Sequence, residues 1–106
     1  MPKLYVYQPG AHEPEIRDLE KLPQGYDQIK AIVEPILKQR LEHVSVLWQG
    51  KRADMFVGDE SALDDLPVNR LATEIYHAAG KQRGANMAGA PVIYGPAVVF
   101  DQIVWR

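Results

Sequence analysis

Polar side chains that could do chemistry gather between residues 59 and 70 of this chain. Asp59 and Glu60 follow one apolar stretch, and Asn69 and Arg70 stand just before another. A carboxylate pair can exchange protons, while an amide, a guanidinium and the free N–H groups of a helix start can hold an anion. The spacing therefore offers one candidate ligand-binding or enzymatic site, made of Asp59, Glu60, Asn69 and Arg70.

A structural interpretation competes for the last two of these residues. The side-chain oxygen of Asn69 can cap a helix by accepting a hydrogen bond from an amide two or three residues later. Arg70 can pair with a nearby surface carboxylate, namely Asp64, Asp65 or Glu74. We favour this structural interpretation and keep the ligand site as the alternative.

The other reactive side chains lack the spacing that known sites require. None of His12, His43 and His77 stands four residues from another, as the paired histidines of a zinc protease do. The acidic run at 59–65 lacks the alternating oxygen ligands and central glycine of a calcium loop. The chain has no cysteine, and neither serine lies in a Gly-x-Ser-x-Gly elbow. We therefore predict no catalytic residue, no metal and no cofactor, and favour a role other than catalysis.

Length, charge and hydropathy limit the number of domains and the classes of binding partner that the chain can have. The 106 residues suit a single domain spanning residues 1–106. The net charge is -2, and twelve Lys and Arg residues are scattered among fourteen Asp and Glu, whereas nucleic-acid binders concentrate positive charge. No apolar run approaches the roughly 20 residues of a membrane helix, and residues 1–10 lack the apolar core of a signal peptide. We expect a cytoplasmic protein that binds neither membranes nor nucleic acid.

Hydrophobic spacing predicts the elements that would position these residues. Aromatic and branched residues at 3–8 predict a strand, and apolar residues at three- and four-residue intervals over 25–43 predict a helix. Alternation on both sides of a Gln-Gly turn predicts a hairpin over 43–60. A second helix at 69–80 and an extended segment at 92–105 complete the order β-α-β-β-α-β. This order predicts an α+β fold with an antiparallel sheet of four or five strands and two helices on one face, compatible with a ferredoxin-like split βαβ arrangement.

Individual residues predict where the helices start, bend and stop. Asp27 is suited to cap the first helix, and Pro35 is expected to kink it because proline lacks an N–H donor. Gly80 is expected to end the second helix in a left-handed conformation. Residues 9–24, which are rich in proline, glycine and charge, are expected to form a surface loop.

Four aromatic residues fall in the predicted terminal strands: Tyr5, Tyr7, Tyr94 and Trp105. A sheet with both helices on one face leaves its other face open. If the four rings share that open face, they form the interface of a homodimer or of a complex with a protein partner. The alternative is that they are scattered or covered.

The run "MFVGDESALDDLPVNRLATEIYHAAG", followed by "APVIYGPAVVF", resembles a domain-of-unknown-function family found in phages, mobile elements and bacteria. The family pattern has an acidic strand end, a leucine, a Leu-Pro-x-Asn step, an Ala-Thr helix and a closing strand with a glycine. The matching positions are Asp59-Glu60, Leu63, Leu66 to Asn69, Ala72-Thr73 and Gly95. The chain departs from the pattern at Glu34-Pro35, where the family has a glycine pair, and at Ser61-Ala62, where it has a glycine.

The resemblance implies a genomic context and no reaction. Together with the missing catalytic spacing, it predicts a small phage- or mobile-element-type accessory protein that acts by protein binding. The alternative is a small-ligand site, for an anion or nucleotide, or an enzymatic site at the start of the second helix.

Overall fold

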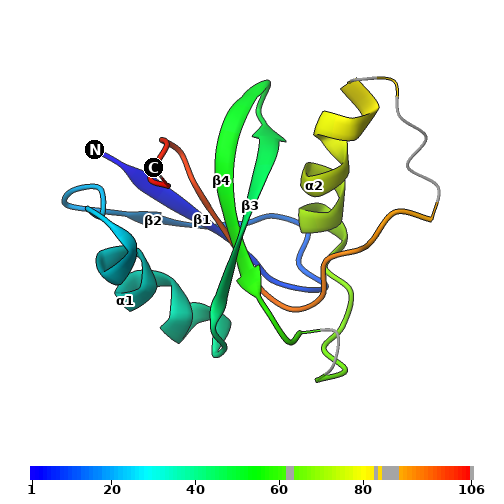
Figure 1. Cartoon of the computed structure of the whole chain (residues 1–106), viewed down its shortest axis with the longest axis horizontal. Helices are drawn as coiled ribbons and strands as arrows, with labels where there is room; N and C mark the ends of the chain where they lie inside the picture. Colours follow the sequence, from blue (N-terminus) through cyan, green and yellow to red (C-terminus); the bar gives the residue numbers. More distant parts are fainter. Residues whose placement is uncertain (62–63, 83, 85–88, 106) are drawn as a thin grey trace.

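A computed structural model describes residues 1–61, 64–82, 84 and 89–105 of the chain. Its elements are β1 (Lys3–Tyr7), β2 (Glu15–Asp18), α1 (Tyr26–Leu37), β3 (Leu41–Trp48), β4 (Lys51–Gly58), α2 (Arg70–Gln82) and β5 (Ala97–Phe100). The strands form one sheet in the order β2-β1-β5-β4-β3, and every neighbouring pair is antiparallel (Figure 1). The predicted α+β class and order β-α-β-β-α-β are confirmed. β2 is an additional strand in the segment expected to be a surface loop.

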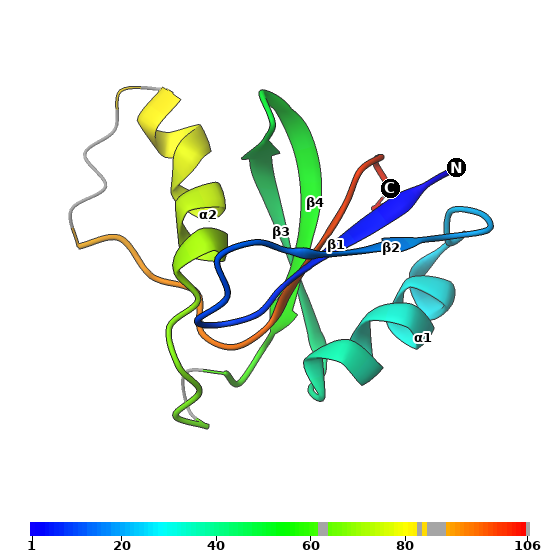
Figure 2. The same ribbon diagram turned by 180° about the vertical axis from the view of Figure 1, so that it is seen from behind.

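The two helices cover opposite faces of the sheet, as the views in Figures 1 and 2 show. The apolar side of α1 packs on one face, with Ile29, Val33 and Leu37 against side chains from β1, β4 and β5. Ala72 of α2 belongs to the core of the other face, and Leu71, Ile75 and Tyr76 pack against it. The expectation that both helices share one face is thus corrected, and the ferredoxin-like arrangement is not adopted.

The inner strands explain why both faces are covered. All four residues of β5, "AVVF", are buried, and so are the last six residues of β4. Successive side chains of a strand point to opposite faces, so a strand that is apolar at every position needs cover on both sides. A sheet with an open face would leave half of these side chains in water.

The first helix is shorter than its apolar spacing predicts. It begins after Gly25, which has φ 82 and supplies no side-chain cap, and Asp27 lies in the first turn. Pro35 stands in the last turn, where the helix ends within two residues, and Lys38 closes it with φ 59. Leu41 then opens β3 and is not part of the helix. Proline therefore marks the end of this helix and not a bend between two long halves.

The second helix runs two residues beyond the predicted stop. Gly80 is a buried residue inside α2, which continues to Gln82. Glycine costs roughly 1 kcal/mol relative to alanine inside a helix and is tolerated there when tertiary contacts hold the helix. The predicted left-handed ending at Gly80 is wrong.

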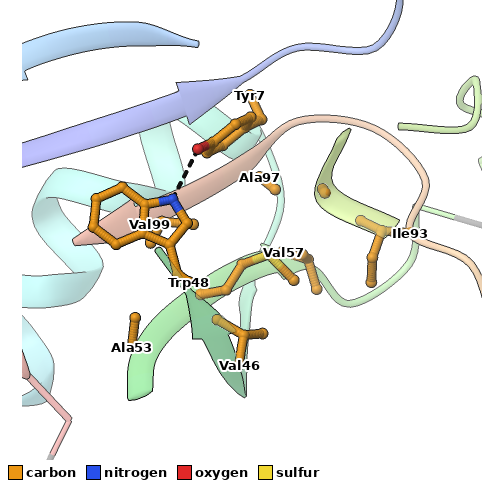
Figure 3. Packing of buried hydrophobic residues seen from close by; sticks show 10 residues of the cluster. Tyr7, Val46, Trp48, Ala53, Val57, Ile93, Ala97 and Val99 are labelled. Carbon is orange, nitrogen blue, oxygen red and sulfur yellow. Dashed lines mark hydrogen bonds between the residues drawn. The ribbon is translucent and has the colours of Figure 1, made fainter. Parts of the chain in front are cut away.

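Aromatic rings from two strands, β1 and β3, meet on the face that α2 covers. The indole Nε1 of Trp48 donates a hydrogen bond to the hydroxyl oxygen of Tyr7 at 2.9 Å, with both side chains buried among Val46, Ala97 and Val99 (Figure 3). The ring of Tyr5 lies 4.7 Å from that of Trp48, centroid to centroid. Two of the predicted interface residues thus belong to this core.

Neither described helix is long and apolar enough to cross a membrane.

Candidate functional site

Asn69 is a structural residue at the start of α2. Its side-chain oxygen accepts a hydrogen bond from the amide of Ala72 at 3.1 Å, which confirms the predicted helix cap. Its side-chain nitrogen donates to the carbonyl oxygens of Tyr7 and Gly95 at 2.7 and 2.9 Å. Asn69 is only 1% exposed and both of its amide hydrogens are engaged. It therefore joins α2 to the segments that carry β1 and β5 and has no donor left for a ligand.

The other three residues of the predicted ligand site lie at the surface. The side chain of Arg70 is 90% exposed and stands 3.7 Å from Glu74, one of the surface partners expected for it. The backbone amide of Asp59 donates to the carbonyl oxygen of Arg40, and that of Glu60 to the side chain of Gln39. No hydrogen bond or ion pair joins Asp59, Glu60, Asn69 and Arg70 to one another in the described part of the chain.

The four aromatic residues expected at an interface do not share one face. Tyr7 is buried and Tyr5 half-buried in the α2-facing core. Trp105 lies on the other face, where its ring stacks on His43 at 4.6 Å and 6°. Tyr94 pairs through its backbone with Val68, outside the sheet. No open aromatic face of the expected kind exists among the described residues.

The open part of the sheet is an edge. β3 is the last strand in the order, and among the described residues no strand pairs with its outer side. It is eight residues long, pairs with β4 in continuous register from Leu41 to Trp48, and contains no lysine, arginine or proline. Proteins usually protect such an edge with those residues or with a bulge, because its unpaired backbone groups invite another strand.

The hairpin turn determines which backbone groups of β3 point outward. Gln49 and Gly50 form a two-residue loop with φ 50 and 79, so Trp48 and Lys51 make a hydrogen-bonded pair. Every second residue of β3 before Trp48 is hydrogen-bonded to β4 in the same way. At the other end, Arg40 accepts a hydrogen bond from Asp59, while the amide of Leu41 points away from β4 to the carboxylate of Glu34.

The hydrogen bonds at both ends of β3 thus agree on which residues of the strand direct their backbone groups away from β4. The N–H and C=O groups of three consecutive odd-numbered positions face the outer side: His43, Ser45 and Leu47.

Two hollows flank this edge on the face that α2 covers. One, of about 370 Å³, lies between the end of β3 and α2, where Leu47, Trp48, Leu71 and Ile75 line it. The other, of about 200 Å³, lies near the start of β3 and includes Val44 and Tyr76 in its wall.

The hollows share a charge pattern. The first includes Glu74 in its lining, and the second includes Glu42 and Asp59. Neither has a lysine, arginine or histidine among its described lining residues. An occupant with a positive charge would therefore be favoured over one with a negative charge.

Asp54 is the one fully buried carboxylate among the described residues. It accepts hydrogen bonds from the backbone amides of Val104 and Trp105 at 2.8 and 2.9 Å, and its other oxygen lies 2.8 Å from Nε2 of His43. Burial alone would raise the pKa of Asp54, but these hydrogen bonds outweigh it and hold the pKa below the ordinary 3.8.

A histidine paired with an aspartate can act as a general base, but here nothing completes such a site. Within the described residues no hydroxyl group hydrogen-bonds to His43, and Ser45 instead accepts a bond from Arg52. Asp54 and His43 therefore hold the C-terminal segment against β4. The described residues also contain no group of three or more His, Cys, Asp or Glu that could hold a metal ion.

Comparison with protein-family models, with curated proteins and with solved structures finds no match. The resemblance to a phage and mobile-element family stays a prediction, and one residue of its motif, Leu63, lies outside the described residues.

Proposed function

We propose that this domain is a protein-binding module that captures an extended polypeptide segment at the outer edge of β3. The observation that carries the proposal is the eight-residue, bulge-free edge of β3, which has no strand beside it in the described chain. An extended segment laid there would exchange backbone hydrogen bonds with His43, Ser45 and Leu47. Strand addition of this kind is a general mode of peptide recognition, in which backbone bonds give affinity and side-chain pockets give specificity.

The hollows beside β3 suggest the side chains of the captured segment. Alternate residues of an added strand point to the same face, so every second side chain would lie near the walls formed by Leu71, Ile75 and Tyr76. These walls favour apolar side chains. Glu42 and Glu74 favour a lysine or arginine in addition. The partner segment is therefore extended, apolar at alternate positions and basic.

The biological setting belongs to the same proposal. The resemblance to a phage and mobile-element family supports an accessory role, which we place in the cytoplasm. A module that binds a segment of a host protein would fit this setting without any catalytic residue.

A displayed library of random peptides tests the proposal, selected on the wild-type protein and counter-screened on Ser45→Pro. Proline at this position removes an outward N–H and is tolerated on an edge strand, so the fold should persist while strand addition is blocked. Ser45→Thr, which keeps the N–H, is the matched control. We expect enriched peptides with alternating apolar and basic residues, and at least a roughly tenfold loss of affinity for Ser45→Pro only.

Peptides that bind wild type and Ser45→Pro equally well would overturn the proposal, as would a selection that enriches no sequence. Circular dichroism and the melting temperature of both variants establish that the hairpin is intact.

A further inference from the structure

A cavity of about 550 Å³ lies on the α1 side of the sheet, away from the hollows beside α2. It lies between residues 22–25, which lead into α1, and residues 103–105 of the C-terminal segment. Most of the described residues that line it are apolar or aromatic, including Leu22, Tyr26, Ile29, Ile103, Val104 and Trp105, while polar atoms of the backbone and of Gln24 also reach its surface. The volume lies within the range of pockets that enclose small organic molecules, roughly 300 to 1,000 Å³.

Two aromatic rings give this cavity a preference for planar groups. The rings of Tyr26 and Trp105 lie 6.1 Å apart at an angle of 74°. At this distance the two rings already contact each other edge to face, and a planar ring can pack against the side of this pair that faces the cavity. Tyr26 is 46% exposed, so one of the two rings stands at the mouth.

The Trp105 wall is held in place without an occupant. His43 stacks on its ring, and the buried carboxylate of Asp54 accepts hydrogen bonds from its backbone amide and from that of Val104. Neither contact depends on a ligand. A wall that is already ordered does not have to lose conformational entropy when a ligand binds.

The described wall of the cavity carries no charged side chain, which disfavours an ionised ligand. The described lining residues include no aspartate, glutamate, lysine, arginine or histidine, and Gln24 supplies the amide side chain. An ion entering this cavity would lose hydration without meeting an opposite charge.

We propose that the cavity between α1 and the C-terminal segment binds a neutral, planar aromatic or heteroaromatic molecule. The ring packs against the pair formed by Tyr26 and Trp105, and the aliphatic side chains of Leu22, Ile29 and Ile103 line the rest of its site. This site is separate from the β3 edge and does not depend on peptide binding.

Titration of isotope-labelled protein with indole, followed by NMR, tests this site. Indole is neutral, planar and bicyclic. We expect saturable shifts at the Trp105 indole N–H and at the methyl groups of Ile29 and Ile103, with a Kd of about a millimolar or lower. Benzoate, which is planar but anionic, should bind at least about tenfold more weakly.

Two variants separate this site from other aromatic surfaces. Tyr26→Ala removes the exposed ring and should weaken indole binding about two- to twelvefold, because an aromatic pair contributes about 0.5 to 1.5 kcal/mol. Tyr76→Ala on α2 is the matched control and should leave the affinity unchanged. The proposal is overturned if indole does not saturate, if its shifts centre on Trp48, if benzoate binds as well, or if Tyr26→Ala binds indole with wild-type affinity.

Discussion

At the residue scale, Asn69 shows how one side chain can carry two structural roles. Its oxygen caps α2, and its nitrogen joins two backbone carbonyl groups that are 62 and 26 residues away in the chain. The cap follows from the residue type and its place before an apolar periodic stretch, so it was predictable. The two donor contacts were not, because they depend on where β1 and the segment before β5 come to lie.

Substitutions at Asn69 should separate the two roles. Asn69→Ala loses the cap and leaves two buried carbonyl groups without their donor, so we expect the free energy of unfolding to fall by about 2 to 4 kcal/mol. Asn69→Asp keeps an acceptor for the cap but places an oxygen against the carbonyls of Tyr7 and Gly95, and should destabilise to a similar degree. Urea denaturation measures both changes.

Arg70→Ala is the control for these variants, since its exposed, loosely paired side chain should change stability by no more than about 0.5 kcal/mol. If Asn69→Asp were as stable as wild type, capping alone would account for Asn69, and the contacts to the two carbonyls would contribute nothing.

At the element scale, the C-terminal segment is held to β4 by a carboxylate and not by strand pairing. The backbone amides of Val104 and Trp105 both donate to Asp54, which lies beside Ser45 in the register of the hairpin. In the sequence, Asp54 is a single acidic residue between Ala53 and Met55 of a predicted strand. Its burial depends on residues 50 and 51 positions later in the chain, so local spacing could not reveal it.

Asp54 should make stability depend on acid pH. Its pKa is lowered in the folded protein, so the unfolded chain takes up the proton first as the pH falls below the ordinary 3.8. The stabilisation is fully present above that pH and is lost as the pH falls through the folded-state pKa. Asp54→Asn should lower the free energy of unfolding by about 2 to 3 kcal/mol at neutral pH.

The difference between wild type and Asp54→Asn should shrink below pH 3.8, as measured by urea denaturation across the acid range. Asp18→Asn is the control: a hydrogen bond from Lys3 also lowers the pKa of Asp18, but this pair is exposed and screened by solvent, so it should change the curve little. A difference that stays constant from neutral to acid pH would contradict the assigned role of the Asp54 carboxylate.

The elements themselves were largely predictable, whereas their arrangement was not. Alternation and helical spacing indicate β1, the β3–β4 hairpin and both helices, since these patterns are local. The β2 strand carries four exposed residues and has no apolar pattern to reveal it. The four consecutive apolar residues "AVVF" did contain a signal for a strand buried on both faces, and that signal argues against placing both helices on one face.

At the scale of the whole molecule, helices cover both faces of the sheet, so a strand of another chain can pair only with its edge strands, β2 and β3. β2 closes one end with a short strand of four exposed residues, including the charged pair Glu15 and Arg17. β3 forms the other edge with eight residues, none of which is a lysine, arginine or proline. The edge could not be found from the sequence, because edge position follows from strand order. Hairpin prediction gives β3 its neighbour on one side only.

The chemical shifts and hydrogen-exchange rates of the backbone amides, measured by NMR with and without a selected peptide, test strand addition most directly. We predict that the peptide shifts and protects from hydrogen exchange the outward amides of His43, Ser45 and Leu47. The inward amides of Val44 and Val46 should be protected already in the free protein. If the peptide instead leaves these outward amides unprotected and perturbs another surface, β3 is not the binding edge.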